Sequence, residues 1–220
     1  ANLLALPLVE RERLLKGNWK IQPSGGKVFN RAWFDVVPPE AVPEGGVECR
    51  FWDLAASTKE LAGDDPDYSA GVCIRKVDET YYVLDCTVGQ WGPAEVERQI
   101  LAATHRDLAR LQREGSGTRY LVRWEIEPGS AGKRETARWV RLLDGVDARG
   151  ERPAGDKITR ALPLAAQAEH GAVVLVRGDW NERWLTHMHH QPDWDHDDIM
   201  DASSGAYAAL ASSGFTFEFV

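Results

Sequence analysis

The order of strand-like and helix-like segments limits the folds available to this chain more than any other feature of its sequence. Residues 47–53, 68–74 and 81–88 are rich in β-branched and aromatic side chains, and a polar turn at 76–79 predicts that the last two form a hairpin. Beyond residue 90, apolar residues recur at helical spacing and alternate with further strand-like runs. The chain is therefore predicted to build an antiparallel group of strands first and then to alternate between helix and strand.

Helix boundaries support this order. Pro93 predicts the start of a helix that ends before Gly115, since proline favours the first helical turn and glycine follows the last. The other elements predicted after residue 115 are strands at 120–124 and 172–176 and helices at 136–143, 156–168 and 198–210. Parallel strands joined by crossover helices, added to an antiparallel hairpin, give the ribonuclease H-like plan. We expect an α/β fold with a mixed five-stranded sheet flanked by helices.

Composition bounds the number of domains and the class of protein. The chain has 220 residues, 43% of them hydrophobic, which is enough for one large domain. Residues 1–45 are interrupted by proline and glycine and are predicted to be a linker or tail, with the folded domain at 46–220. No apolar run approaches the ~20 residues of a membrane span, so no membrane partner is expected. Three cysteines without metal-type spacing indicate reduced thiols and a cytoplasmic setting.

Acidic residues stand where predicted strands end and where a predicted helix begins. Asp53 and Glu125 close two strands, and Asp197 and Asp198 precede the last helix. Carboxylates that converge at one end of a sheet repel one another and stay ionised together only when a cation neutralises them. Oxygen ligands that are partly open to water suit Mg²⁺ or Mn²⁺, and sites with two such ions cleave phosphodiesters. The sequence thus predicts a two-ion site at Asp53, Glu125 and one of the adjacent aspartates.

Each of these acidic residues also has a structural interpretation. A strand-end aspartate commonly caps the next turn, and aspartates in a first helical turn complement the helix dipole. Glu127 alternates with Glu125 and is the second choice at that strand, while Asp201 is expected to orient the ligands rather than bind the metal. Asp85 ends the hairpin and is either an auxiliary ligand or a solvated residue.

The formal net charge of −8 argues against a nucleic-acid partner unless basic residues gather locally. Lys133 and Arg134 follow the Glu125 strand, and Lys157 and Arg160 lie further along the chain. These four residues are the candidate DNA contacts, although each also suits a solvated helix face. The histidines within 187–190 lack the cysteine or second spaced histidine of a zinc site, so zinc is disfavoured there.

Four sequence blocks together resemble one known family. They are Trp52-Asp53-Leu54-Ala55 and the segments 124–133, 155–161 and 196–202. In order and spacing they are similar to the nuclease domain of bacteriophage large terminases over residues 47–211, although segment 189–195 lacks the Phe-Pro that usually precedes the last block. The resemblance implies a ribonuclease H-like endonuclease, dependent on divalent metal, that takes part in packaging DNA into a procapsid. Asp53, Glu125 and Asp197 or Asp198 would be its metal-binding catalytic residues.

The resemblance also implies partners and a location. Double-stranded DNA would be the substrate, and the terminase ATPase domain, the small terminase subunit and the portal would be the partners. Residues 1–45 would be the end of the ATPase domain and its connection to the nuclease, and the phage or prophage protein would act in the host bacterial cytoplasm. Two other interpretations stay open: another ribonuclease H-like nuclease, such as a Holliday-junction resolvase or a transposase core, and a non-catalytic docking module of a packaging motor.

Overall fold

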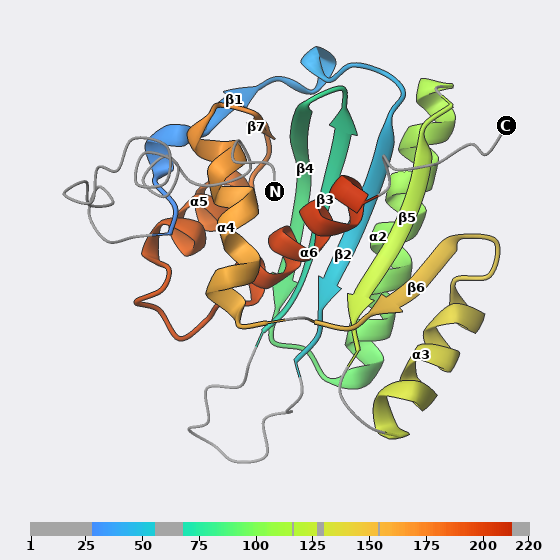
Figure 1. Ribbon diagram of the computed structural model, residues 1–220. Coiled ribbons are helices and arrows are strands. Elements are labelled where there is room, and N and C mark those ends of the chain that lie inside the picture. The colour runs from blue at the N-terminus through green and yellow to red at the C-terminus, as the bar shows by residue number, and fades with distance from the viewer. Residues whose placement is uncertain (1–27, 56–67, 116, 127–129, 154, 213–220) are drawn as a thin grey trace, which may run out of the picture.

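The computed structural model describes residues 28–55, 68–115, 117–126, 130–153 and 155–212, the side chains of 130–135 excepted. These residues form a seven-stranded mixed sheet in the order β1-β7-β4-β3-β2-β5-β6 (Figure 1). The strands are β1 (Asp35–Val37), β2 (Val47–Asp53), β3 (Ser69–Val77), β4 (Thr80–Gly89), β5 (Arg119–Glu125), β6 (Asp147–Glu151) and β7 (Val173–Val176). The α-helices are α2 (Pro93–Glu114), α3 (Ser130–Leu142), α4 (Lys157–Glu169), α5 (Asn181–His190) and α6 (Asp198–Ser212).

The pairing of the strands follows the expected plan. β2, β3 and β4 are antiparallel neighbours, and the predicted β3–β4 hairpin is confirmed. Its turn contains Asp78 at a φ of 51°, a left-handed conformation that suits a tight hairpin. β5 and β6 continue the sheet in parallel beyond β2, while β7 and β1 continue it in parallel beyond β4. The mixed sheet therefore has an antiparallel centre and parallel flanks.

The sheet has seven strands where the sequence predicts five. β6 carries the residues Asp-Ala-Arg-Gly-Glu, which show no apolar alternation and form an edge strand beside β5. β1 has three residues and lies in the segment predicted to be a linker. Phe29 and Phe34 are also buried in the core, so the folded unit includes residues that precede position 46. The predicted tail at 1–27 lies outside the described residues.

Most helix ends agree with the sequence. α2 begins at Pro93 and ends before Gly115, which adopts a φ of 65°. α4 begins after Asp156, whose side chain accepts a hydrogen bond from the backbone N–H of Thr159 at 2.9 Å. α3 starts at Ser130, about 1.7 turns before the predicted position 136. No described helix combines the length and the apolar character needed to cross a membrane.

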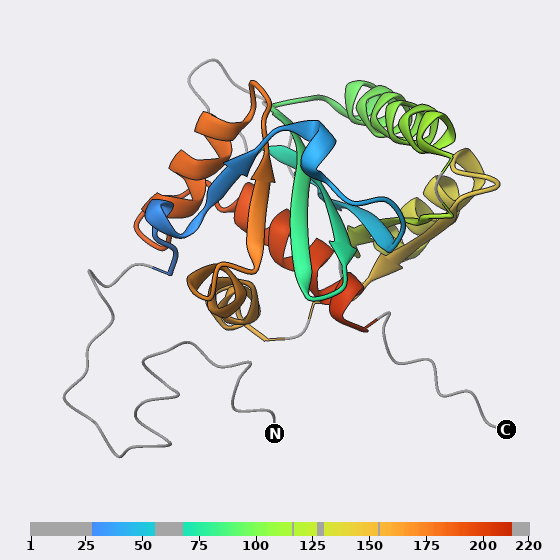
Figure 2. The ribbon, with the colours of Figure 1, turned by 90° about the horizontal axis from the view of Figure 1, so that it is seen from above.

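Helices cover both faces of the sheet (Figure 2). α2 and α3 lie over one face and α4 and α6 lie over the other, while α5 packs against α6 and the short segment Arg31–Trp33. Because side chains alternate along a strand, Trp52 of β2 enters the core beneath α2 while its neighbour Phe51 enters the core beneath α6. Asp53, two residues after Phe51, therefore belongs to the α6 face.

α6 lies very close to β2. A Cβ atom built on Gly205 would stand 2.5 Å from the ring of Phe51, which is closer than real carbon atoms approach. The helix can therefore rest on this ring only because position 205 has no side chain. The neighbouring α6 residues on either side are small, and Ala202, Ser204 and Ala206 are buried. This seating brings the first turn of α6 to the end of β2.

Candidate metal centre

The strand register places Asp53 and Glu125 side by side. Trp52 of β2 pairs with Trp124 of β5 in a parallel ladder, and each acidic residue directly follows its tryptophan. Both tryptophans are buried in the core under α2 and α3. Since successive side chains alternate, the two carboxylates belong to the opposite face, at the same end of neighbouring strands. The convergence expected from the sequence is present for this pair.

The first turn of α6 adds two more carboxylates. Asp198 begins the helix and Asp201 follows one turn later, and both are buried. Burial raises the pKa of Asp53 well above its usual range, and the charges of Asp201, Asp198 and Glu125 raise it further, in that order. The pKa of Glu125 is also raised, chiefly by burial and also by Asp201, although Arg160 opposes the rise. Four carboxylates thus share one electrostatic site.

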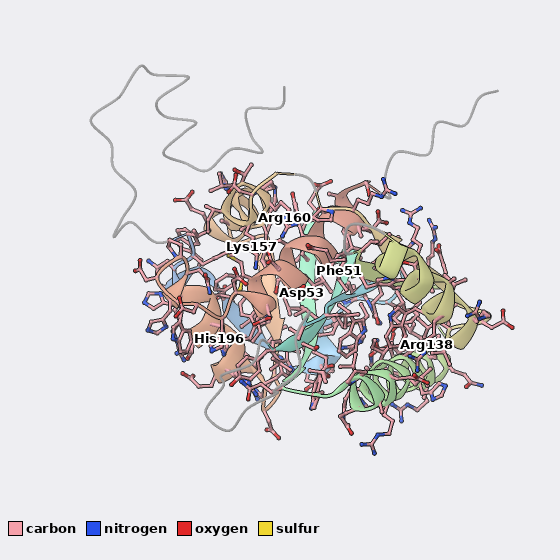
Figure 3. The ribbon with its side chains drawn as sticks, turned by 90° about the horizontal axis from the view of Figure 1, so that it is seen from below. Phe51, Asp53, Arg138, Lys157, Arg160 and His196 are labelled. Atoms are coloured by element: carbon pink, nitrogen blue, oxygen red, sulfur yellow. The ribbon has the colours of Figure 1, made fainter. Side chains whose placement is uncertain are left out.

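Two cations of α4 stand at the edge of this cluster (Figure 3). Lys157 Nζ lies 2.6 Å from Asp197 Oδ1 and 3.1 Å from Asp201 Oδ2. Arg160 lies 3.2 Å from Glu125 Oε2 and 3.0 Å from Asp201 Oδ1. The spacing of three residues places both cations on one side of α4. Within the described ranges, no lysine or arginine forms an ion pair with Asp53, so its charge is not directly neutralised.

The adjacent aspartates differ in their surroundings. Asp197 is held by Lys157, whereas Asp198 is buried and is one of the charges that raise the pKa of Asp53. Asp198 therefore stands closer to the centre of the cluster. Asp201, expected to act from outside the ligand set, perturbs Asp53 more strongly than Asp198 does. Its spacing of three residues from Asp198 was the sequence signal for a shared helix face.

Several other candidates lie elsewhere. Asp85 belongs to the opposite face, where its carboxylate accepts a hydrogen bond from Arg50 Nη2 at 2.8 Å, so it is not an auxiliary ligand of this cluster. Arg138 of the basic helix α3 pairs with Glu97, and Figure 3 shows it far from Asp53. Glu127 and the side chains of Lys133 and Arg134 lie outside the described residues, so their proposed roles stay predictions.

The histidines near the end of α5 pack against one tryptophan. The ring centroids of His187 and His190 lie 4.8 and 5.1 Å from that of Trp194, in the segment between α5 and α6. Burial lowers the pKa of His187, and the neighbouring charge of Arg183 lowers it further. These rings therefore support the segment that leads into Asp197 and Asp198.

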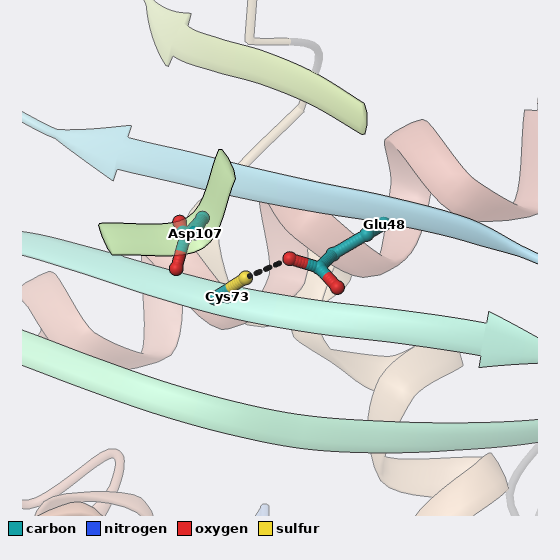
Figure 4. A group of neighbouring side chains, drawn as sticks. All are labelled: Glu48, Cys73 and Asp107. Atoms are coloured by element: carbon teal, nitrogen blue, oxygen red, sulfur yellow. Dashed lines mark hydrogen bonds between the residues drawn. The ribbon is translucent and has the colours of Figure 1, made fainter. Parts of the chain in front are cut away.

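A second acidic group has a tighter geometry. In the described part of the chain, only Glu48, Cys73 and Asp107 bring three potential ligand atoms within 4.8 Å of one another (Figure 4). Arg50 Nε lies 2.5 Å from Asp107, Arg75 lies 3.0 Å from Glu48, and Arg110 also pairs with Glu48. Arginines thus already neutralise these carboxylates, which does not suit a metal site. The Asp53 cluster is more widely spaced, as carboxylates shared between two ions ~3.5–4 Å apart would be.

The sequence matches a known protein family. Residues 50–210 match the family described as the terminase RNaseH-like domain. The chain belongs to this family. The matched region runs from the middle of β2 to the last turns of α6 and so contains every carboxylate of the Asp53 cluster. No curated protein matches this terminase domain in sequence.

Solved structures show the same fold at low sequence identity. The human cytomegalovirus terminase nuclease domain, Mn soaked and inhibitor bound, is 11% identical, with a TM-score of 0.63 over 83% of this chain and 95% of that one. The large terminase nuclease from the thermophilic phage G20c with bound magnesium is 17% identical, with a TM-score of 0.52 over 84% of this chain and 98% of that one. These likenesses establish the ribonuclease H-like fold of the terminase domain.

Proposed function

We propose that this terminase domain is a divalent-metal-dependent DNA endonuclease that cuts concatemeric viral DNA during genome packaging. The observation that supports the proposal is the convergence of Asp53, Glu125, Asp198 and Asp201 from two strands and one helix. Family membership and the metal-bound nuclease neighbours lend further support.

The residues of the cluster fit a pair of Mg²⁺ or Mn²⁺ ions. All donors are carboxylate oxygens, which these hard cations prefer. Burial raises the pKa of Asp53, and three neighbouring carboxylates raise it further, so a bound cation would stabilise its ionised form. Asp53, Glu125 and Asp198 would hold the ions, and Asp201 would lie beside them. Asp197, which pairs with Lys157 at the edge of the cluster, is the alternative ligand to Asp198.

The bound ions would supply an activated water and stabilise the leaving oxygen during phosphodiester hydrolysis. The protein's own residues have other tasks. Lys157 and Arg160 remain partly exposed, and their positive ends can meet the phosphates on either side of the cleaved bond. Asp201 contacts both cations and so fixes their position relative to Asp53. Lys133 and Arg134 are further candidate phosphate contacts.

The acidic surface of the domain suggests how its substrate is brought to it. A net charge of −8 gives weak affinity for DNA outside the local basic residues. We therefore propose that double-stranded DNA is delivered by the packaging machinery, namely the terminase ATPase domain, the small terminase subunit and the portal, in the host bacterial cytoplasm. Cleavage by the isolated domain should be slow and should show little sequence preference.

The decisive experiment is a plasmid-nicking assay with Mn²⁺. Asp53→Asn removes one ligand charge with almost no change in shape, and it should abolish nicking while the thermal unfolding curve stays cooperative. Asp35→Asn is the matched control, because Asp35 is an exposed strand aspartate at the far edge of the sheet. Nicking by Asp53→Asn at the rate of the control would reject the assignment. Failure of calorimetry to detect Mn²⁺ binding by the wild type would instead favour a docking module.

A further inference from the structure

A cavity of about 420 Å³ opens beside the carboxylate cluster. It shares Glu125, Asp201 and Arg160 with the cluster and extends away from it between α4, α6 and β6. α6 packs mainly over β2 and β3, so β5 and β6 are left less covered on this face and the hollow forms there. The cavity is thus continuous with the proposed catalytic centre, on which the inference below rests.

The floor of the cavity is apolar. The apolar residues that line it are Phe51, Gly205, Ala208, Ala209 and the prolines 153 and 163. The small residues of α6 are the reason for the hollow, because larger side chains at 208 and 209 would fill it. Such a floor offers little to a phosphate, but it suits a flat apolar ring.

Basic residues of β6 and of the segment that follows it also line the cavity. Arg149 and Arg152 line it together with Glu151, and Arg149 Nε lies 2.8 Å from Glu151 Oε1. Arg152 is exposed and forms no ion pair with any described residue. The lining of the cavity therefore combines carboxylates of the proposed metal site, an apolar surface and an arginine that is available for an anion.

We propose that this cavity receives one nucleotide adjacent to the scissile phosphate, with its base on the apolar floor and its next phosphate at Arg152. The volume lies in the lower part of the ~300–1,000 Å³ range of small-ligand sites, which admits a single nucleotide and excludes a duplex. A base can enter only after it leaves the stack, so local unstacking of the duplex accompanies cleavage. DNA that is mismatched or frayed at the cut should therefore react faster than perfect duplex.

The direct test uses calorimetry with two probes, dAMP and 2-deoxyribose 5-phosphate, in the presence of Mn²⁺. Burial of the base should make dAMP bind the wild type about tenfold more tightly than the sugar phosphate. Ala208→Trp, which fills the cavity from an exposed position, should remove this difference, whereas Ala109→Trp on the exposed side of α2 should retain it. Equal binding of both probes by the wild type, or an unchanged preference in Ala208→Trp, would overturn the proposal.

A cleavage test separates this inference from the proposed function. Ala208→Trp should nick intact duplex about tenfold more slowly than Ala109→Trp, because the indole occupies the space of the base. An abasic residue in the DNA has no base to place in the cavity, so nicking next to it should be restored. Lack of restoration at the abasic residue rejects the base pocket. If the wild type nicks no DNA, the endonuclease assignment fails. The calorimetric measurement with dAMP then still shows whether the cavity binds a base. Ser212→Trp, exposed at another part of the lining, repeats both tests if Ala208→Trp unfolds.

Discussion

The two acidic clusters of the domain lie on opposite faces of the same strand and are compensated differently. On the α2 face, Glu48 and Asp107 are buried among Arg50, Arg75 and Arg110. Burial alone would raise the pKa of Asp107, but Arg50 and the hydroxyl of Tyr120 outweigh it and hold the pKa below the usual range.

On the α6 face the balance is reversed. The pKa of Asp53 is raised by burial and by three neighbouring carboxylates, and the opposing effect of Lys157 is smaller than any of these. A buried cluster of acids therefore does not by itself indicate a metal site. The informative property is negative charge that no nearby arginine or lysine balances. That property belongs to Asp53, whereas arginines pair with the carboxylates around Cys73.

The largest expected effect concerns the compensated cluster. Arg50→Met should destabilise the fold by ~3–5 kcal/mol, because it removes the arginine that pairs with the buried carboxylate of Asp107 and leaves the hydroxyl of Tyr120 and the more remote Arg110. Denaturant unfolding measures this difference, and the double variant Arg50→Met/Asp107→Leu should recover most of it. A cost below ~1 kcal/mol for the single variant would show that the arginine is not what stabilises Asp107.

Mn²⁺ should stabilise the folded domain only by binding to the Asp53 cluster. Mn²⁺ at a hundred times its dissociation constant should raise the free energy of unfolding by ~2.7 kcal/mol in the wild type. The same gain is expected in Asp35→Asn, and little or none in Asp53→Asn. Stabilisation that survives in Asp53→Asn but disappears in Glu48→Gln would assign the ions to the other face.

The carboxylate of Asp53 should also lower the stability of the folded domain when no metal is present. In metal-free buffer at pH 7, Asp53→Asn should be more stable than the wild type by ~1 kcal/mol, because it removes repulsion among four acids. Thermal unfolding with a chelator compares the two proteins, with Asp35→Asn as the reference. A loss of stability in Asp53→Asn would mean that the cluster is already balanced.

Low pH should reduce the stability that Asp107 contributes to the fold. The folded pKa of Asp107 lies below its unfolded value, so its contribution is present above that unfolded value and is lost as the pH falls through the folded one. Between about pH 5 and pH 2 the wild type should therefore lose more stability than Asp107→Asn. Parallel stability curves for the two proteins would contradict the lowered pKa.

The smallest effect is expected at the rim of the Asp53 cluster. Lys157→Gln should reduce the slope of log K against log salt for DNA binding by ~1, because one phosphate contact is lost. Mn²⁺ affinity should not fall, since the variant removes a cation that competes for Asp197 and Asp201. A fall in Mn²⁺ affinity would indicate that Lys157 organises the ligands instead.

Local signals in the sequence were sufficient for much of the fold. Pro93 and Gly115 mark the ends of α2, and strand-end acids at 53 and 125 mark the proposed centre, because these features act within one turn or one strand. The edge strand β6 could not be predicted, since its charged residues gain their conformation from pairing with β5.

Other features depend on which elements meet in space. The alternation of Glu48 and Arg50 with apolar residues in β2 suggests a solvated face, yet α2 covers it and supplies Asp107. The pairing of Lys157 and Arg160 with Asp201 joins two helices that are separated by a strand and another helix. Neither arrangement has a local pattern, so only the folded chain shows them.

The missing side chain of Gly205 has a consequence for the chemistry. Asp198 and Asp201 belong to the same helix. The distance from both of them to Asp53 and Glu125 therefore depends on how closely α6 packs against the sheet. Even one methyl group at position 205 would act as a wedge against Phe51 and lift both aspartates at once. The spacing of the four carboxylates thus depends on a residue that carries no side chain and no charge.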